Sequence, residues 1–510
     1  MYPTLSQKTN SKTTTCESTW ATVGPIVNHV LTLSIYRNSG LQFDKNAEKR
    51  LRRKIDLHIV PLVAVLYLFC FIDRSNIGNA RLANFEEDLG LQGNDYNLVL
   101  SVFYISYALF EIPATLLCKV MGPGWFIPLT TFLFGICTVG TAFANTKGQI
   151  IACRLLLGIF ESGMLPGIAY YLSRWYRRAE LAFRLGMYIV MAPLSGAFGG
   201  LLASGILSLD HVGSLKEWRM IFGVEGIITI GLSLVTLALL TDNPNTARWL
   251  NEEEKTLALD RVKSERVAQD RVLDKVNAAK LKRGILSPIT LSTAFIFLLS
   301  NVVVLGISFF LPTIIRTIYP DQTRVHQQLL TVPPYIVASF CFLLVSWLAT
   351  VYDTRQVFLF LSGPLVMVGY AILLKSTDPT VRYAAIFLTA SCAFFGGSLS
   401  NAQVSANTDS DTARNIAIST NGVFGYLGGL IATWTYLPWD GPMYPIGNGL
   451  NLAVSAVISI TSLTFLWWMK MDNKRRDEKT PAEKEEELSG LTREQISDLD
   501  WKHPDFRWRP

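Results

Sequence analysis

Long apolar segments alternate with short polar ones along most of this 510-residue chain. Each segment is close to the length of about twenty residues that an α-helix needs to cross a bilayer, and is too long for a barrel strand. The pattern therefore predicts an all-α membrane protein with twelve transmembrane helices. The predicted spans are residues 55–75, 95–119, 125–143, 149–173, 182–208, 219–240, 288–315, 328–350, 356–374, 382–403, 415–437 and 448–469.

A polar stretch at residues 241–286 divides these spans into six and six. We therefore expect an N-terminal six-helix bundle at 51–240 and a C-terminal one at 287–470, with polar tails at 1–50 and 471–510. The linker has apolar positions in a loosely helical rhythm. This rhythm is typical of an amphipathic helix on the membrane surface or of a solvated charged helix, and it leaves both open.

Lysine and arginine cluster in the loops on one side of the predicted membrane. They occur before the first span at 49–54, after the fourth at 174–184 and after the twelfth at 470–476, whereas the loop after the first span is mainly acidic. Because short basic loops stay in the cytoplasm, both tails are expected there, as an even number of spans requires. We expect a monomer in the plasma membrane.

The composition excludes several other classes of protein. Half of the residues are hydrophobic, 17% are charged and the mean hydropathy is +0.30, which is unlike a soluble enzyme. The net charge of +6 comes from basic residues between the spans, so no nucleic-acid partner is expected. The seven cysteines and five histidines are scattered, and no CxxC motif or phosphate loop is present. We expect no metal, no cofactor and no enzymatic activity.

Two pairs of charged residues interrupt the spans of the first half, although charge inside a membrane is costly. Asp73 and Arg74 are adjacent, so their side chains point about 100° apart on a helix. Arg154 and Glu161 are seven residues apart, so they share one helix face at a separation of about 10 Å. Asp73 and Arg74 form either a solvated pair at the end of the first helix or part of a functional site. For Arg154 and Glu161 the apolar flanks favour a functional role.

The simplest arrangement pairs Arg154 with Asp73 and leaves Arg74 and Glu161 facing a central space. The planar fork of an arginine can bind a carboxylate through two hydrogen bonds and keeps its charge. A carboxylic acid in a cavity of low dielectric constant can take up and release a proton. This set of groups suits a carrier of anions.

Other polar positions have weaker interpretations. Glu111 is expected to hold helices or loops together, and Arg219 and Glu225 are expected to form pairs between helices. The second half is poor in charge, so an asymmetric site would place charges in the first bundle and amide hydrogen bonds in the second. The remaining candidate substrate contacts are therefore Tyr104, Gln403 and Asn421.

Five segments, taken in order, carry a family resemblance. They are FIDRSNIGNARLANF in the first span, CRLLLGIFESGMLPGIAYYLSRWYRRAE through the fourth, EWRMIFGVEGIITI in the sixth, NPNTARWLNEEE in the linker and PWDGPMYPIGNGLNL before the twelfth. The chain resembles the major facilitator superfamily and, within it, the fungal allantoate-permease branch of the anion:cation symporter family. The resemblance covers residues 50–470 or so.

The resemblance implies two bundles that open a central site alternately to each side of the membrane. It also implies proton-coupled transport of a small organic anion such as allantoate, nicotinate, pantothenate or biotin. Asp73 and Glu161 would carry protons, Arg74 would hold the substrate carboxylate, and Arg154 would bind the acidic partner or the substrate.

The gating motif expected between the second and third spans lacks its aspartate, since the segment reads CKVMGPGWF. The loop between the eighth and ninth spans keeps Asp353 and Arg355, which become the predicted gating residues. Two other functions stay open with the same fold: export of a secondary metabolite, and a nutrient sensor that does not transport. A large folded cytoplasmic extension would be expected for the sensor.

Overall fold

The computed structural model describes residues 44–209, 217–269, 284–408, 411–491 and 499–510, and the single residues 211, 213 and 215. Two compact units divide the chain, residues 1–57 and residues 58–510. Of the first unit only the start of helix α2 is described. All contacts given below lie within the second unit.

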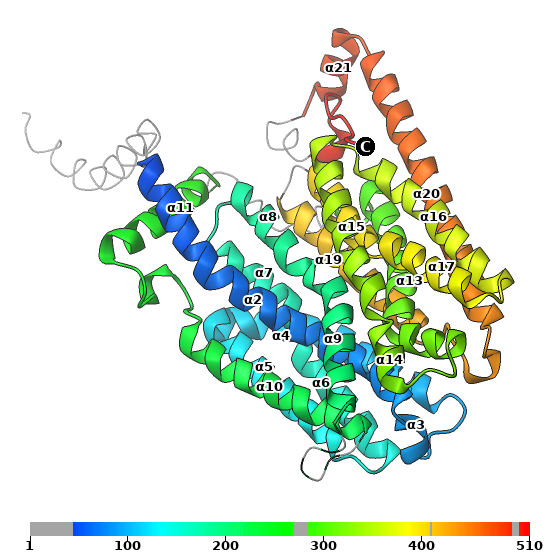
Figure 1. The fold of residues 1–510 in the computed structure, drawn as a ribbon. Helices are drawn as coiled ribbons and strands as arrows, with labels where there is room; N and C mark the ends of the chain where they lie inside the picture. Colours follow the sequence, from blue (N-terminus) through cyan, green and yellow to red (C-terminus); the bar gives the residue numbers. More distant parts are fainter. Residues whose placement is uncertain are drawn as a thin grey trace, which may run out of the picture. The chain divides into compact units, whose positions relative to one another are not determined.

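The described residues are almost entirely helical (Figure 1). The helices of the first half are α2 (Lys45–Leu82), α3 (Phe85–Asp88), α4 (Asp95–Met121), α5 (Pro123–Ala142), α6 (Lys147–Glu161), α7 (Met164–Ser173), α8 (Arg178–Ile189), α9 (Met191–Leu207) and α10 (Trp218–Leu239). The linker contains η1 (Pro244–Thr246) and α11 (Glu252–Gln269). The second half contains α13 (Pro288–Ile318), α14 (Arg324–Leu329), α15 (Val332–Val351), α16 (Arg355–Lys375), α17 (Pro379–Ala393), α18 (Phe395–Ala406), α19 (Asp411–Ala432), η2 (Pro438–Asp440), α20 (Pro445–Asp477), α21 (Pro481–Leu488) and η3 (Asp500–Lys502).

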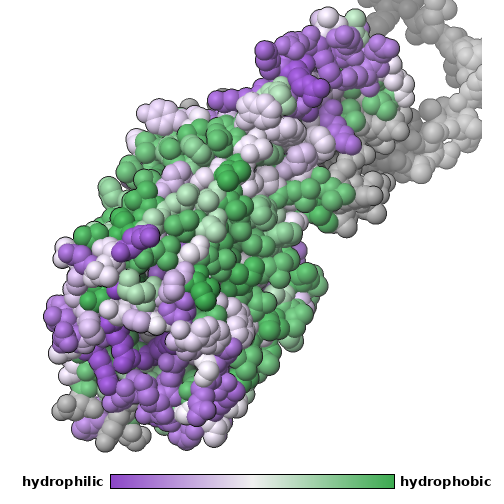
Figure 2. Space-filling model, turned by 90° about the vertical axis from the view of Figure 1, so that its right-hand side faces the viewer, coloured by the Kyte–Doolittle hydropathy of each residue, from purple (hydrophilic) through white to green (hydrophobic). Residues whose placement is uncertain are grey.

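Among the described residues, eleven helical segments are long and apolar enough to cross a bilayer, and Ile416–Ala432 in α19 forms a shorter apolar helix. The predicted all-α membrane fold with twelve spans is confirmed. Four of the spans each consist of two consecutive helices: α6 with α7, α8 with α9, α14 with α15, and α17 with α18. On the face shown in Figure 2, hydrophobic residues form a broad band and hydrophilic residues gather at its two ends.

The same helix pairings occur in both halves of the chain. Helix α4 packs against α6 and α5 against α10, while α15 packs against α17 and α16 against α20. If the spans are numbered in chain order, the second packs against the fourth and the third against the sixth. In the second half, the eighth packs against the tenth and the ninth against the twelfth in the same way. Between the halves, α9 packs against α14 and α15, and α4 packs against α19. Two bundles of similar internal packing therefore meet at one interface.

The helix ends of the two bundles lie on two opposite sides, called the linker side and the loop side. The linker side is the side on which α4 ends at Met121 and α10 ends at Leu239, and the loop side is the opposite one, where α2 ends at Leu82 and α4 begins at Asp95. The basic segments at 174–184 and 470–476 lie on the linker side, which the positive-inside rule predicts to be the cytoplasmic side.

Hydrogen bonds join the two bundles on the loop side. The Trp434 indole donates to the Ser101 hydroxyl at 2.9 Å, Ser101 Oγ lies 2.8 Å from Thr433 Oγ1, and Gln328 Nε2 donates to the Asn79 carbonyl at 3.1 Å. A further bond, from the Tyr426 hydroxyl to Glu111 at 2.8 Å, joins them nearer to the linker side. Glu111 therefore holds two helices together, as expected. The bundles are closed against each other on the loop side.

Helix α2 continues past the predicted end of the first span at residue 75 and runs to Leu82. The polar residues of its last turns have partners within the protein: Asn79 Nδ2 donates to Asn76 Oδ1 at 2.9 Å, and Arg81 lies 3.0 Å from Glu86. Asp73 is thus nine residues from the helix end and only 1% exposed. The interpretation of Asp73 and Arg74 as a solvated pair at a helix end is wrong.

The described part of the linker is bound to the N-terminal bundle rather than free on a surface. In α11, Arg261 is 2% exposed and lies 2.7 Å from Glu180 of α8. Residues 270–283 of the predicted linker, and residues 1–43 of the predicted N-terminal tail, lie outside the described residues.

The predicted C-terminal tail is partly bound to the C-terminal bundle. Helix α20 continues to Asp477, beyond the predicted boundary at residue 470. Trp508 is 2% exposed in a hydrophobic cluster with Phe465 and Met469, and its indole donates to Asp472 at 2.8 Å. Residues 499–510 therefore form part of the packed structure.

Candidate functional site

A buried ion pair links α2 to α6 in the middle of the N-terminal bundle. Arg74 NH2 lies 3.0 Å from Glu161 Oε2, with the Glu161 side chain fully buried and that of Arg74 10% exposed. Glu161 Oε1 has no hydrogen-bond partner among the described residues, and neither does Arg74 Nε. The pair therefore leaves hydrogen-bonding capacity on both of its members.

Three aromatic rings surround the Arg74 guanidinium group. Its central carbon lies 4.7 Å from the ring centroid of Phe71 and 5.1 Å from those of Phe103 and Tyr107. Aromatic faces attract a cation and fix the plane of a guanidinium, so these rings hold Arg74 in one orientation.

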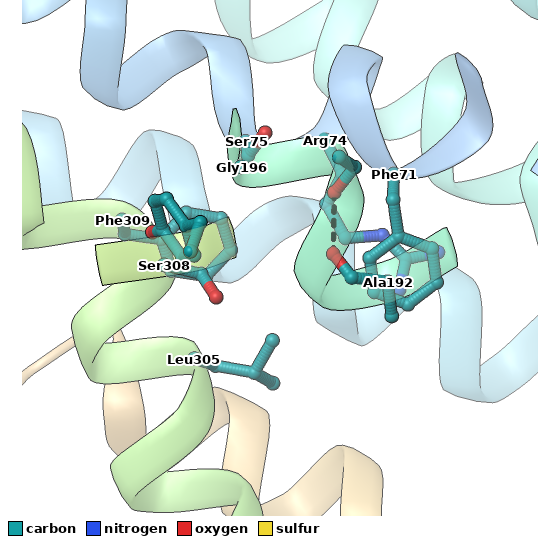
Figure 3. Close-up of a pocket in the computed structure, with 10 residues that line it drawn as sticks. Phe71, Arg74, Ser75, Ala192, Gly196, Leu305, Ser308 and Phe309 are labelled. Carbon is teal, nitrogen blue, oxygen red and sulfur yellow. Dashed lines mark hydrogen bonds between the residues drawn. The ribbon is translucent and has the colours of Figure 1, made fainter. Parts of the chain in front are cut away.

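Arg74 lies in the wall of a small cavity that both bundles line. Figure 3 shows Arg74 and Phe71 of α2 on one side of it and residues of α13, including Ser308 and Phe309, on the other. The cavity also contacts Ser195 and Gly196 of α9, Leu305 of α13 and Tyr335 of α15. Its volume is about 10 Å³, close to the space that one water molecule requires, so this conformation leaves no room for a larger molecule in it.

The sequence of α6 explains the position of Glu161. Thr146 caps the helix: its hydroxyl accepts from the Gln149 backbone N–H, and the Gln149 side chain accepts from the Thr146 N–H. Gly158 lets α6 approach α4 closely, because a Cβ atom there would lie 2.5 Å from the Phe103 carbonyl oxygen. Glu161 is the last residue of α6, immediately before the break that leads into α7.

The direct ion pair differs from the simplest predicted arrangement. We expected Arg154 to meet Asp73, with Arg74 and Glu161 facing a central space, whereas the ion pair that forms is Arg74–Glu161. Asp73 Oδ2 instead accepts a hydrogen bond from Thr229 of α10 at 3.3 Å. Arg154 is 3% exposed, and its Nε and NH2 groups have no hydrogen-bond partner among the described residues.

The two charges on α10 also differ from the expectation of pairs between helices. Arg219 donates to the carbonyl oxygens of Ala142 and Ala144 at the end of α5, so it caps that helix. Glu225 is fully buried, and neither of its carboxylate oxygens has a partner among the described residues.

The predicted substrate contacts divide between two places. Tyr104 is near the site: it is buried, its ring contacts Phe103 and Phe309, and its hydroxyl has no partner within the described part of the chain. Asn421 is bonded inside the C-terminal bundle, to Asn401 at 2.9 Å and Thr293 at 3.2 Å.

Gln403 lies elsewhere, under the bound C-terminal segment. Its side chain is fully buried, and Nε2 donates to the Arg509 carbonyl at 2.8 Å. The structure does not bring Gln403 to Arg74, and its placement gives it a structural partner instead of an open position.

The predicted gating residues lie on the linker side between α15 and α16. Arg355 NH2 is 2.7 Å from Asp353 Oδ1, and the Asp353 side chain is half exposed. The corresponding position in the first half contains a carboxylate that the sequence reasoning missed. Asp242, just after α10, accepts from the Gly124 backbone N–H at 3.2 Å and lies 3.1 Å from Arg174. Asp242, at the start of the linker, thus lies against the loop between the second and third spans, which has no aspartate of its own.

Two helical bundles that meet around a small cavity with a buried ion pair define a membrane carrier, since the cavity can be exposed by moving one bundle against the other. Among the described residues, no group of three His, Cys, Asp or Glu side chains is arranged as a metal site.

Comparison with known proteins gives the family. A sequence model described as Major Facilitator Superfamily matches residues 63–433. The high-affinity nicotinic acid transporter of Saccharomyces cerevisiae is 31% identical, over 84% of this chain and 79% of its own. The MFS-type transporter cnsO of Penicillium expansum is 31% identical over 91% of each chain, and an uncharacterised transporter of Schizosaccharomyces pombe is 30% identical over 86% of this chain and 88% of its own.

Among solved structures, a bacterial homologue of the human lysosomal transporter Spinster in an inward-facing, unoccupied conformation has a TM-score of 0.62. It is 15% identical in sequence, and the match covers 83% of this chain and 98% of that chain. The chain belongs to the major facilitator superfamily and is a multi-pass membrane transporter. The resemblance to this superfamily is confirmed.

Proposed function

We propose that this transporter carries a small organic anion together with a proton by alternating access. The observation that carries the proposal is that Arg74, in the wall of a cavity lined by both bundles, is paired with the buried Glu161 behind it. A carboxylate substrate is the natural competitor of Glu161 for Arg74, because both are planar anions that accept hydrogen bonds from the same fork.

The surroundings of Arg74 favour a flat or apolar body on the carboxylate. Phe71, Phe103 and Tyr107 surround the guanidinium, and Phe309 and Tyr335 line the cavity from the other bundle. Aromatic side chains like these can stack on an aromatic ring in the substrate. The relative named as a nicotinic acid transporter handles an aromatic monocarboxylate, so nicotinate is the first probe to test.

Exchange of partners on Arg74 provides a reason for proton coupling. Before substrate binds, Arg74 and Glu161 neutralise each other at 3.0 Å. When a substrate carboxylate takes Arg74, an ionised Glu161 would remain buried without its cation, which costs several kcal/mol. Binding of one proton restores neutrality. The proposal therefore predicts one proton for each monocarboxylate and no net charge movement.

The contacts between the bundles support alternating access. On the loop side the bundles are bound through Ser101, Thr433 and Gln328, so the site would next open on the linker side. We propose that the Asp353–Arg355 pair and the Arg174–Asp242 pair hold the linker side when that side closes. In the predicted orientation this cycle brings the anion from the outside into the cytoplasm.

The experiment is uptake of labelled nicotinate, and of a panel of other carboxylates, by proteoliposomes that contain the purified chain. An inward pH gradient without a membrane potential should drive accumulation of at least one of them, and collapse of the gradient should release it. Uptake that ignores the gradient would remove symport. Accumulation only against the opposite gradient would instead favour the alternative of export.

A further inference from the structure

Glu225 is a fully buried carboxyl group that the exchange of partners at Arg74 does not use. Its side chain is 0% exposed, and both carboxylate oxygens are without a hydrogen-bond partner among the described residues. An isolated charge in a protein interior is so costly that such a group either has a counter-charge or becomes neutral by binding a proton. The neighbours of Glu225 decide between these two states.

Two contacts on α10 fix where Glu225 lies. Residues 222, 225 and 229 share one face of the helix, because they are spaced three and four apart. The Arg154 guanidinium lies 5.6 Å from the centroid of the Phe222 ring, and Thr229 donates to Asp73 at 3.3 Å. Along the helix axis, position 225 is about 4.5 Å from Phe222, which contacts Arg154, and about 6 Å from Thr229, which binds Asp73. It therefore lies between Arg154 and Asp73.

The charged groups that face Glu225 come from two helices, Asp73 from α2 and both Arg154 and Glu161 from α6. The other helices packed against α10 are α5 and α9, which contain no Asp, Glu, Lys, Arg or His. Cys137 of α5 is the only titratable side chain on those two helices. Because Arg74 is bound by Glu161, Arg154 is the cation left for both Asp73 and Glu225 among the described groups.

Charge balance then requires a proton. If all three carboxyl groups were ionised, three negative charges would face the two arginines. We infer that Glu225 is a proton-binding residue of the transport cycle, which shares an exchangeable proton with Asp73 around Arg154. The inference rests on the proposed symport for its role in the cycle. When substrate takes Arg74, Arg154 alone faces three carboxyl groups, so the cluster needs two protons instead of one.

The proton-binding residue Glu225 and the substrate-binding residue Arg74 lie in different places. Arg74 lines the cavity, whereas Glu225 does not, and the charged groups that act on Glu225 are Asp73, Arg154 and Glu161. A change at Glu225 should therefore alter the pH dependence of transport and leave the apparent affinity for substrate unchanged at a fixed pH. A residue that only supported the fold would not separate these two quantities.

The test compares the wild-type chain with Glu225→Gln and Glu225→Asp in proteoliposomes, with labelled nicotinate as the probe and exposed Glu87→Gln as the matched control. For one proton per anion, a gradient of one pH unit should give about tenfold accumulation in the wild type and the control. Glu225→Gln lowers the proton count of both states by one, so accumulation should stay near tenfold per pH unit, while the pH dependence of nicotinate counterflow should shift to lower pH because one negative charge is gone from the cluster. Glu225→Asp should keep the pH dependence of the wild type at least in part. A pH dependence of counterflow in Glu225→Gln equal to that of the wild type overturns the inference.

A second measurement decides the matter without any substrate. Infrared difference spectra recorded as pH is varied detect the carbonyl stretch of protonated carboxyl groups in the purified chain. Glu225→Gln should lose one titrating band and Glu225→Asp should shift it, with Glu87→Gln as before. Spectra of Glu225→Gln that match the wild type overturn the inference. If the wild type does not respond to a pH gradient with any carboxylate, the proposed symport fails, and the infrared result still supports or overturns proton binding at Glu225.

Discussion

Arg74→Lys isolates what the arginine fork contributes to substrate binding, because the substitution keeps the positive charge. Arg74 reaches Glu161 at 3.0 Å and stacks among three rings whose centroids lie 4.7 to 5.1 Å from its guanidinium carbon. A lysine ammonium is a point charge without a planar fork, so it can bind a carboxylate only through single hydrogen bonds.

The size of the effect follows from the contacts that are lost. One hydrogen bond to a charged group contributes about 1.5–3 kcal/mol, and contact of a cation with an aromatic face contributes about 0.5–1 kcal/mol, part of which lysine retains. A net loss of about 2–3 kcal/mol corresponds to an increase in KM of about 30- to 140-fold.

The assay is the initial rate of nicotinate uptake into proteoliposomes at a fixed pH gradient and varied substrate concentration. Arg219→Lys is the matched control: this arginine also contacts an aromatic ring, at 4.4 Å from Trp218, but it binds backbone carbonyls at the end of α5, away from the cavity. Its KM should stay within about twofold of the wild type. A KM for Arg74→Lys within about threefold of the wild type would remove Arg74 from the substrate site.

Two further substitutions test other parts of the structure. Glu161→Gln removes the competitor for Arg74 and the carboxyl group that the exchange of partners at Arg74 leaves without a cation. Counterflow of nicotinate should persist with an equal or lower KM, while accumulation driven by a pH gradient disappears. Intact accumulation would assign the transported proton to Asp73 and Glu225 around Arg154 instead. Trp508→Ala removes a buried indole and its bond to Asp472, which should cost about 3–5 kcal/mol and lower the melting temperature of the purified chain. Trp467→Ala, at a side chain that is 62% exposed, is its control, and equal melting temperatures would show that the C-terminal segment is not bound.

The class of fold was predictable from the sequence because hydrophobic length is a direct consequence of bilayer thickness. The residues that carry charge inside the membrane were also identifiable, since few charges interrupt the apolar runs. Asp73, Arg74, Arg154 and Glu161 all prove to be buried in the N-terminal bundle. The end of the first span was not predictable, because hydropathy falls where Asn76 and later polar residues find partners inside the protein.

Which charges meet was beyond the sequence. Adjacent residues such as Asp73 and Arg74 point in different directions, but their absolute rotation about the axis of α2 depends on packing at positions such as Gly78, where a Cβ atom would lie 2.5 Å from the Phe309 carbonyl oxygen. That rotation brings Arg74 to Glu161 and turns Asp73 toward Thr229 of α10. The expected pair of Asp73 with Arg154 would have required a different rotation.

Contacts between segments far apart in the chain could not be predicted from the sequence either. Gln403 is a polar residue in an apolar span, which suggested a place in the cavity. Residues 499–510 instead pack against its helix, and its side-chain amide donates a hydrogen bond to the Arg509 carbonyl. No local pattern in the segment around Gln403 indicates this partner. Asp242 is a similar case, since its neighbour Gly124 lies 118 positions earlier in the chain.

Coupling is tested most directly by the ratio of internal to external nicotinate at equilibrium, measured in proteoliposomes at several pH gradients with the membrane potential clamped at zero and then at a negative value. Exchange of Glu161 for a substrate carboxylate on Arg74, with uptake of one proton, predicts that the ratio rises about tenfold for each pH unit and does not change with the potential. A ratio that follows the membrane potential, or that stays at one across the pH gradients, would contradict it.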